Sequence, residues 1–273
     1  MLDILILILL GFAGAAFGSI VGLGGGIILV PGLLWLGPQL TGAELGHEVA
    51  VGVSLAVLIV TALASTTTYA KAGRVDFRSG WLLFVASGPA AMLGAAMTGL
   101  MGGAGFQLMF GVFILLMAWL LIARDRLKPA ARRWPIMRSH TEADGTQRQY
   151  GYALAPLLAI GFGVGLISGL FGIGGGSLFV PAMVLLFRFP PHIAAATSMF
   201  VIFLSSITGS AVHGWLGEID YRLALALAPG AWLGGKAGAY IAGRMSGNGL
   251  LWLLRATLVV MAIRLIWSGV AEL

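Results

Sequence analysis

Apolar and polar positions follow one another in long blocks along this chain rather than at short intervals. Eight apolar runs alternate with short polar segments, at residues 4–35, 48–70, 80–101, 106–123, 151–187, 193–216, 222–243 and 249–271. An α-helix of about 20 apolar residues crosses the hydrocarbon layer of a bilayer, which is about 30 Å thick. Six of the eight runs have a length near this value. The pattern predicts an all-α, polytopic integral membrane protein.

The first and fifth runs are too long for one straight membrane helix. A helix of 32 residues, the length of the first run, would reach about 48 Å. Each of these runs also contains three consecutive glycines, at 24–26 and 174–176. We therefore expect in each a spanning helix, a break at the glycines, and a shorter helix that re-enters the membrane.

The chain contains an internal repeat. Three segments of the first half recur in the same order in the second: GSIVGLGGGIILVPG at 18–32 and SGLFGIGGGSLFVPA at 168–182, AVGVSL at 50–55 and AAATSM at 194–199, GRVDFR at 73–78 and GEIDYR at 217–222. We expect two homologous transmembrane repeats, 1–123 and 150–273. Transporters built from repeats place their substrate site between the two halves, often where helices are broken.

The segment 124–149 is the longest polar stretch, with seven basic residues, three acidic residues and two prolines. Basic loops stay on the cytoplasmic side of a membrane, so we interpret it as a cytoplasmic linker. Basic residues also dominate at 71–78, whereas the equivalent loop at 217–222 is mostly acidic. This difference favours an inverted second repeat, but a parallel repeat follows if the first and fifth runs each cross only once.

Composition agrees with a membrane protein. The chain is 59% hydrophobic and 10% charged, with a mean hydropathy of +0.99, whereas soluble domains are about 25% charged. A pI of about 10.2 would suit a nucleic-acid partner, but the positive charge lies mainly in loops between apolar runs, so we expect none. The chain has no cysteine, which excludes disulfides and thiolate chemistry.

The two glycine strings predict an anion site. They comprise Gly24, Gly25 and Gly26 in the first repeat and Gly174, Gly175 and Gly176 in the second. A helix that starts after a break points free N–H groups and its positive dipole end at the adjoining cavity. A dinucleotide site is not expected, because G-x-G-x-x-G is not matched. The alternative is that the glycines only allow close helix packing.

Hydroxyl side chains cluster in the helices that follow the breaks. Ser54 and Ser198 are equivalent in the two repeats, Thr197 precedes Ser198, and Ser177 begins the second short helix. We expect these four residues to contribute to substrate binding. The alternative is that such hydroxyls bond to their own helix or join helices.

Two ionisable residues lie inside apolar runs at places that suggest function. Lys236 lies well within 222–243, and a charge at that depth marks a functional site unless it reaches an interface along its stem. A lysine there would suit an anion. His213 can exchange a proton near neutral pH, so it is a candidate for proton coupling or else a structural histidine.

Enzymatic signatures are missing from the sequence. Its four histidines are scattered, and it has neither H-E-x-x-H nor G-x-S-x-G. We expect no catalytic residues, no metal site and no cofactor.

The repeated motifs resemble the TauE/SafE family of sulfite-exporter-like permeases. Each repeat has a G-x-G-G-G-x-x-x-V-P segment, a later helix similar to A-x-x-[TS]-S, and a G-x-[IV]-D-[FY]-R segment. The resemblance spans nearly the whole chain outside the linker. It implies a bacterial inner-membrane transporter of small sulfur-containing anions such as sulfite or organosulfonates. The first repeat departs from the pattern, since Val53 stands where the second has Thr197, so the halves would contribute unequally if that threonine matters.

The sequence thus predicts a secondary transporter of a small anion in the bacterial inner membrane, with lipid as its solvent. Three alternatives remain open, namely a carrier of a cation or other small ion or metabolite, a scaffold subunit that does not transport, and a membrane enzyme. The glycine-rich helices leave a homo-oligomer open as well, because they suit contacts within or between chains.

Overall fold

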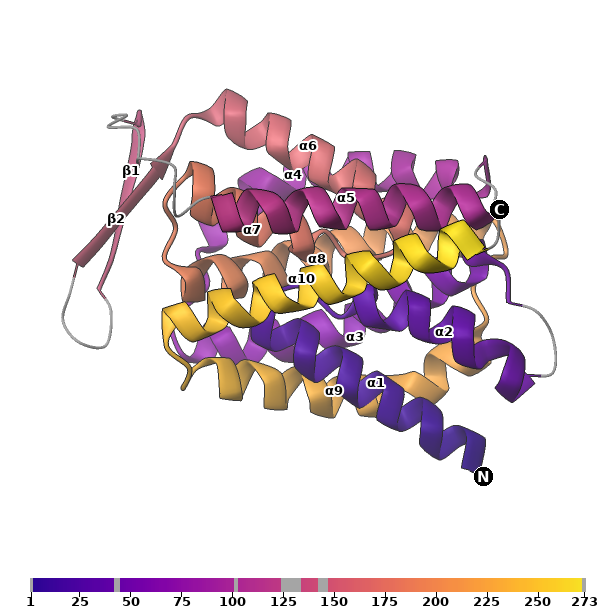
Figure 1. The fold of residues 1–273 in the computed structure, drawn as a ribbon. Coiled ribbons are helices and arrows are strands. Elements are labelled where there is room, and N and C mark those ends of the chain that lie inside the picture. Colours follow the sequence, from indigo (N-terminus) through magenta and orange to yellow (C-terminus); the bar gives the residue numbers. More distant parts are fainter. Residues whose placement is uncertain (1, 42–44, 101–102, 124–133, 142–146, 272–273) are drawn as a thin grey trace.

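The computed structural model describes residues 2–41, 45–100, 103–123, 134–141 and 147–271. Within them it has ten α-helices and one β-hairpin (Figure 1). The first five helices are α1 (Leu2–Val21), α2 (Gly26–Thr41), α3 (His47–Lys71), α4 (Phe77–Met97) and α5 (Gly103–Ala123). The other five are α6 (Leu154–Phe171), α7 (Gly176–Leu186), α8 (Pro191–Trp215), α9 (Tyr221–Ala242) and α10 (Gly247–Ala271). Six helices are long and apolar enough to cross a membrane, so the expected all-α membrane bundle is confirmed.

The predicted helix breaks are present at both glycine strings. Helix α1 stops at Val21 and α2 starts at Gly26, while α6 stops at Phe171 and α7 starts at Gly176. Three glycines in each break have positive φ angles: 79°, 84° and 106° at Gly22, Gly24 and Gly25, and 66°, 70° and 72° at Gly172, Gly174 and Gly175. L-residues with a side chain rarely adopt this conformation, so the glycines allow the chain to turn back.

The two broken pairs enter the bundle from opposite ends. Helices α1 and α2 both have their outer ends on the side away from the β-hairpin, whereas α6 and α7 both have theirs beside it (Figure 1). Helix α7 has 11 residues and is about 16 Å long, too short to cross a bilayer. This arrangement supports an inverted second repeat, which stays a prediction, as do the repeat boundaries at 123 and 150.

Each broken pair packs mainly on a helix of the other half. Helix α1 lies along α9, α6 lies along α4, and α3 lies against α8. Glycines make the first two contacts close, because a Cβ on Gly94 of α4 would overlap the carbonyl oxygen of Leu166, and one on Gly230 of α9 would overlap that of Ile8. Membrane helices pack closely through such small residues, and here the packing joins the two halves into one bundle.

The β-hairpin was not predicted from the sequence. Strands β1 (Ile136–Thr141) and β2 (Gln147–Tyr152) pair antiparallel, with Ile136 opposite Tyr152. The end of the segment interpreted as a linker is therefore ordered structure, while 124–133 and 142–146 lie outside the described residues. Asp144-Gly145 between the strands is a common hairpin turn signal, and it could have revealed the element.

Replacing Gly94 with alanine should destabilise the bundle, because the added methyl group would overlap the backbone of α6. Overpacking of this kind costs about 1–3 kcal/mol. Gly163→Ala is the matched control, since a Cβ there meets nothing within 4 Å and alanine favours the helix. Thermal unfolding in detergent should show a lower midpoint for Gly94→Ala only. Equal midpoints for the two variants would contradict the close packing of α4 on α6.

Candidate functional site at the crossing of the helix breaks

The two helix breaks pack directly against each other in the bundle. A Cβ on Gly26 would overlap the carbonyl oxygen of Gly172, and a Cβ on Gly176 would overlap that of Gly22. The N-termini of α2 and α7 therefore meet there, and we call this contact the crossing. The neighbouring Gly25 and Gly175 pack within their own helix pairs, against Gly14 and against Val164 and Phe179.

Two equivalent serines bond across the crossing. Ser54 of α3 donates from its Oγ to the carbonyl oxygen of Gly172 at 2.8 Å. Ser198 of α8 donates to the carbonyl oxygen of Gly22 at 2.7 Å. Both serines are fully buried, so each repeat satisfies a carbonyl that the break leaves free in the other repeat.

Two aliphatic side chains close the crossing. A Cβ on Gly24 would lie 3.0 Å from Leu58 and 3.3 Å from Ile202, and one on Gly174 would lie 2.8 Å from Ile202 and 3.0 Å from Leu58. Leu58 and Ile202 thus pack against both breaks at once. They carry no signal in the sequence, because an aliphatic residue in an apolar helix is expected everywhere.

Helices α3 and α8 each carry one buried stripe that includes the residues packed at the crossing. Residues four apart lie on the same helix face, and the stripe residues are Ser54, Leu58, Ala62 and Thr66 of α3 and Ser198, Ile202, Ser206 and Ser210 of α8. None is more than 8% exposed. Beyond the two aliphatic residues, the hydroxyls of Thr66, Ser206 and Ser210 have no hydrogen-bond partner within the described part of the chain. Unsatisfied buried hydroxyls are uncommon and call for an explanation.

Three predicted site residues lie elsewhere or cannot be placed. The Oγ1 of Thr197 accepts a hydrogen bond from the backbone N–H of Asp76 at 3.0 Å, so this threonine faces α4 rather than the crossing. Lys236 is exposed, with its Nζ 4.7 Å from the ring centre of Trp232. It therefore lies on the outer surface of α9. The side chain of Ser177 lies outside the described residues.

His213 continues the stripe of α8 by almost one turn beyond Ser210. It is fully buried, and its Nδ1 lies 2.7 Å from a carboxylate oxygen of Glu218. Its repeat equivalent, Tyr69, donates to the carbonyl oxygen of Ser19 at 2.7 Å. A polar side chain thus ends the stripe of each helix.

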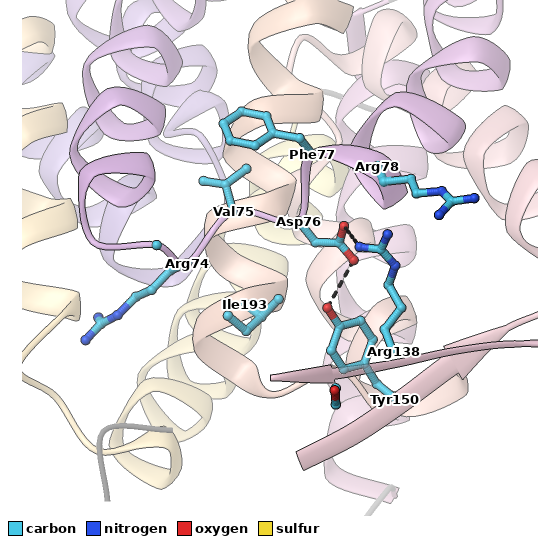
Figure 2. Close-up of a pocket in the computed structure, with 10 residues that line it drawn as sticks. Arg74, Val75, Asp76, Phe77, Arg78, Arg138, Tyr150 and Ile193 are labelled. Carbon is cyan, nitrogen blue, oxygen red and sulfur yellow. Dashed lines mark hydrogen bonds and ion pairs between the residues drawn. The ribbon is translucent and has the colours of Figure 1, made fainter. Parts of the chain in front are cut away.

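A second polar cluster surrounds Asp76 beside the β-hairpin (Figure 2). The Asp76 carboxylate accepts from the Oγ of Ser79 at 2.6 Å, the hydroxyl of Tyr150 at 3.0 Å and the guanidinium of Arg138 at 2.7 Å. Burial and the Asp76 charge raise the pKa of the Tyr150 phenol, so this group stays neutral and donates. The cluster ties the hairpin to the N-terminus of α4.

The opposite end of the bundle lacks such a tie among the described residues. Asp220 is the repeat equivalent of Asp76, and it caps α9 by accepting from the backbone N–H groups of Arg222 and Leu223. Asp76 therefore combines a helix cap with a hairpin anchor, whereas Asp220 is a cap alone. A cavity of about 340 Å³ beside Asp76 is lined by the 73–78 loop and by the hairpin residues Arg138 and Tyr150.

Comparison with known proteins decides the family. The profile described as "Sulfite exporter TauE/SafE" matches residues 7–265. The chain belongs to the TauE/SafE family. A "Probable membrane transporter protein YunE" of Bacillus subtilis (strain 168) is 43% identical over 272 residues, covering 98% of this chain and 99% of that protein. This confirms the resemblance seen in the repeated motifs.

More distant relatives extend the same description. A "Probable membrane transporter protein" of Xylella fastidiosa (strain 9a5c) is 28% identical, covering 96% of this chain and 94% of that protein. "Probable membrane transporter protein MJ0441" of Methanocaldococcus jannaschii is 27% identical, covering 94% and 93%. No solved structure matches the chain significantly. The protein is a multi-pass membrane transporter and not an enzyme.

Removing either cross-repeat serine hydroxyl should destabilise the crossing, because a carbonyl buried in the bundle loses its donor. Ser54→Ala and Ser198→Ala should each cost about 1 kcal/mol, which lowers the thermal midpoint in detergent. Thr257→Ala is the control, since that hydroxyl bonds within its own helix to Leu253. If the serine variants unfolded at the same temperature as the control, the two bonds would not stabilise the breaks.

Neutralising Asp76 should release the hairpin. In Asp76→Asn the Arg138 guanidinium loses its ionic partner, so amide hydrogen exchange of residues 147–152 should become faster. Asp220→Asn removes the equivalent charge where no described hairpin is attached, and hairpin exchange should stay unchanged. Unaltered exchange in Asp76→Asn would mean that the cluster does not anchor the hairpin.

Proposed function

We propose that this TauE/SafE transporter moves a small oxoanion, sulfite or an organosulfonate, by secondary transport. The family takes its description from sulfite export. The observation that carries the proposal is the crossing, where the N-termini of two short helices meet. Each helix N-terminus carries roughly half a positive charge, and two such ends together favour an anion without a charged side chain.

We propose that the substrate travels along the stripes of α3 and α8. Helices α3 and α8 run in opposite directions, because Gly52 near the start of α3 lies against His213 near the end of α8. The unpartnered hydroxyls of Ser206 and Ser210 therefore lie on one side of Leu58 and Ile202 along the bundle, and that of Thr66 lies on the other. Sulfite oxygens accept hydrogen bonds, which suits hydroxyl donors. Leu58 and Ile202 would have to separate for passage, together with the two glycine breaks that they cover.

The proposed substrate-binding residues at the crossing are the backbones of Gly24–Gly26 and Gly174–Gly176 and the hydroxyls of Ser54 and Ser198. Each of these hydroxyls has one hydrogen and would have to leave its carbonyl partner, Gly172 or Gly22, in order to donate to the anion. Thr197 acts in this proposal by positioning Asp76, and Lys236 is left out because its exposed side chain stacks on Trp232. His213 remains the proposed proton-coupling residue, since its paired imidazole lies at the end of the α8 stripe.

The charges support a cytoplasmic hairpin end in a bacterial inner membrane. Described helix ends and loops beside the hairpin carry basic residues, Lys71, Arg74, Arg78, Arg138, Arg148, Arg188 and Arg244. The opposite end carries Asp3, Glu48, Glu218 and Asp220, with Arg222 as the basic residue in its 217–222 loop. This asymmetry follows the positive-inside rule.

The alternatives find less support in the described residues. No group of three His, Asp, Glu or Cys side chains lies close enough there to hold a metal ion, which disfavours a metal carrier. A scaffold subunit would have no use for buried hydroxyls without partners, because each of them costs stability.

Removing the unpartnered hydroxyls should lower the rate of transport without lowering the stability of the protein. The double variant Ser206→Ala, Ser210→Ala loses no hydrogen bond within the described structure, so its thermal midpoint should stay equal or rise. Its sulfite flux should fall about two- to tenfold, the effect of a lost substrate hydrogen bond. Thr67→Ala, at an exposed residue that bonds its own helix, should leave both quantities unchanged.

The measurement is flux of radiolabelled sulfite, sulfate and a simple organosulfonate into proteoliposomes, with and without a pH gradient. Saturable flux of one sulfur oxoanion supports the proposal, and its dependence on the gradient reports coupling. If the double variant transported sulfite as fast as wild type, the stripe would not be part of the transport path. Absence of flux for all three anions would overturn the substrate assignment.

A further inference from the structure

We infer that the protein binds one anionic phospholipid in a groove between α4, α6 and the β-hairpin. The groove has a volume of about 400 Å³, within the range of ligand pockets, about 300–1,000 Å³. Its walls are Trp81, Leu82 and Val85 of α4, Leu154 of α6, and Ile136 and Tyr152 of the hairpin, and Arg78 completes the lining. The groove thus combines apolar walls with one cationic side chain.

The apolar part of the groove faces the membrane. Trp81 is 51% exposed, Val85 64% and Leu154 48%, and Phe77–Leu100 is a candidate membrane span. These side chains would meet acyl chains rather than water in a bilayer. Tryptophan is enriched at the level of lipid headgroups, which places this end of α4 near the membrane surface.

Arg78 provides the contact for a headgroup. It lies three, four and seven residues before Trp81, Leu82 and Val85, on the same face of α4. Its side chain is exposed and points away from the ion pair of Asp76 and Arg138 (Figure 2). The guanidinium makes no hydrogen bond or ion pair with any residue that the structure describes. A free guanidinium beside an apolar groove suits a phosphate group, which it can bind through two parallel hydrogen bonds.

Charge selects the class of lipid. Asp76 forms an ion pair with Arg138, whereas Arg74 in the preceding loop and Arg78 at the start of α4 have no acidic partner among the described residues. A basic pocket between membrane helices on the cytoplasmic side favours an anionic headgroup over a zwitterionic one. The occupant is therefore a lipid with net negative charge, such as phosphatidylglycerol.

The repeat offers an internal control. Arg222 is the equivalent of Arg78 and is also exposed, but it lies at the other end of the bundle, where the described chain has no hairpin to form a wall. We therefore expect one such lipid site in the described part of the chain, whichever substrate the protein transports.

The test compares lipid binding by purified variants in detergent. Native mass spectrometry counts retained phosphatidylglycerol, and thermal unfolding is followed as phosphatidylglycerol or phosphatidylcholine is added. We expect wild type to retain one phosphatidylglycerol and to be stabilised by that lipid alone. Arg78→Gln should weaken binding about tenfold, as for the loss of a charged hydrogen bond, whereas Arg222→Gln should bind like wild type.

A second variant tests the apolar part. Val85→Trp fills the groove and keeps Arg78, so it should also lose the retained lipid, with its unfolding temperature unchanged when no lipid is added. Three results would overturn the inference: retention by Arg78→Gln equal to wild type, equal stabilisation by both lipids, or equal losses in the two arginine variants. Undiminished retention by Val85→Trp would show that no acyl chain occupies the groove.

Discussion

Every backbone polar group inside a bilayer needs a partner, because the hydrocarbon layer supplies none. The two glycine breaks interrupt their helices and free carbonyl groups at Gly22 and Gly172. In this bundle the partner comes from the other half of the chain, as Ser198 for Gly22 and Ser54 for Gly172. A broken helix can therefore exist at this depth only because its counterpart lies against it.

Features that depend on neighbouring residues could be predicted from the sequence, whereas features that depend on how the helices pack could not. The helices and their breaks could be predicted from the apolar runs and the glycines within them, because these depend on neighbouring residues in the sequence. The equivalence of Ser54 and Ser198 could be predicted from the repeated segments. Leu58 and Ile202 could not be recognised, because nothing in an apolar sequence tells which aliphatic side chain covers a break. Thr197 and Lys236 were assigned to the substrate from their residue type and their position within apolar runs, and these do not fix which way a helix face turns.

The two ends of the bundle differ at two equivalent aspartates. Asp76 and Asp220 occupy the same position of the same motif and both cap a helix. Among the described residues Asp76 also binds the hairpin, through Arg138 and Tyr150, whereas Asp220 binds no hairpin. The hairpin was missed because its polar, basic strands resemble a solvated linker. In the part of the chain that the structure describes, equivalent serine bonds thus join the two helix breaks at the centre, whereas the two ends of the bundle differ.

The exchange of packing partners between the halves has a consequence for biosynthesis. Helix α1 lies along α9, and the Gly22 carbonyl bonds to Ser198, so the first broken pair finds its partners only after most of the chain has been made. Until Ser198 has been made, the Gly22 carbonyl lacks the donor that it has in the folded bundle. Assembly of this protein ends by closing contacts of long sequence separation, which are slow to form, and the first residues inserted are among the last to become fixed.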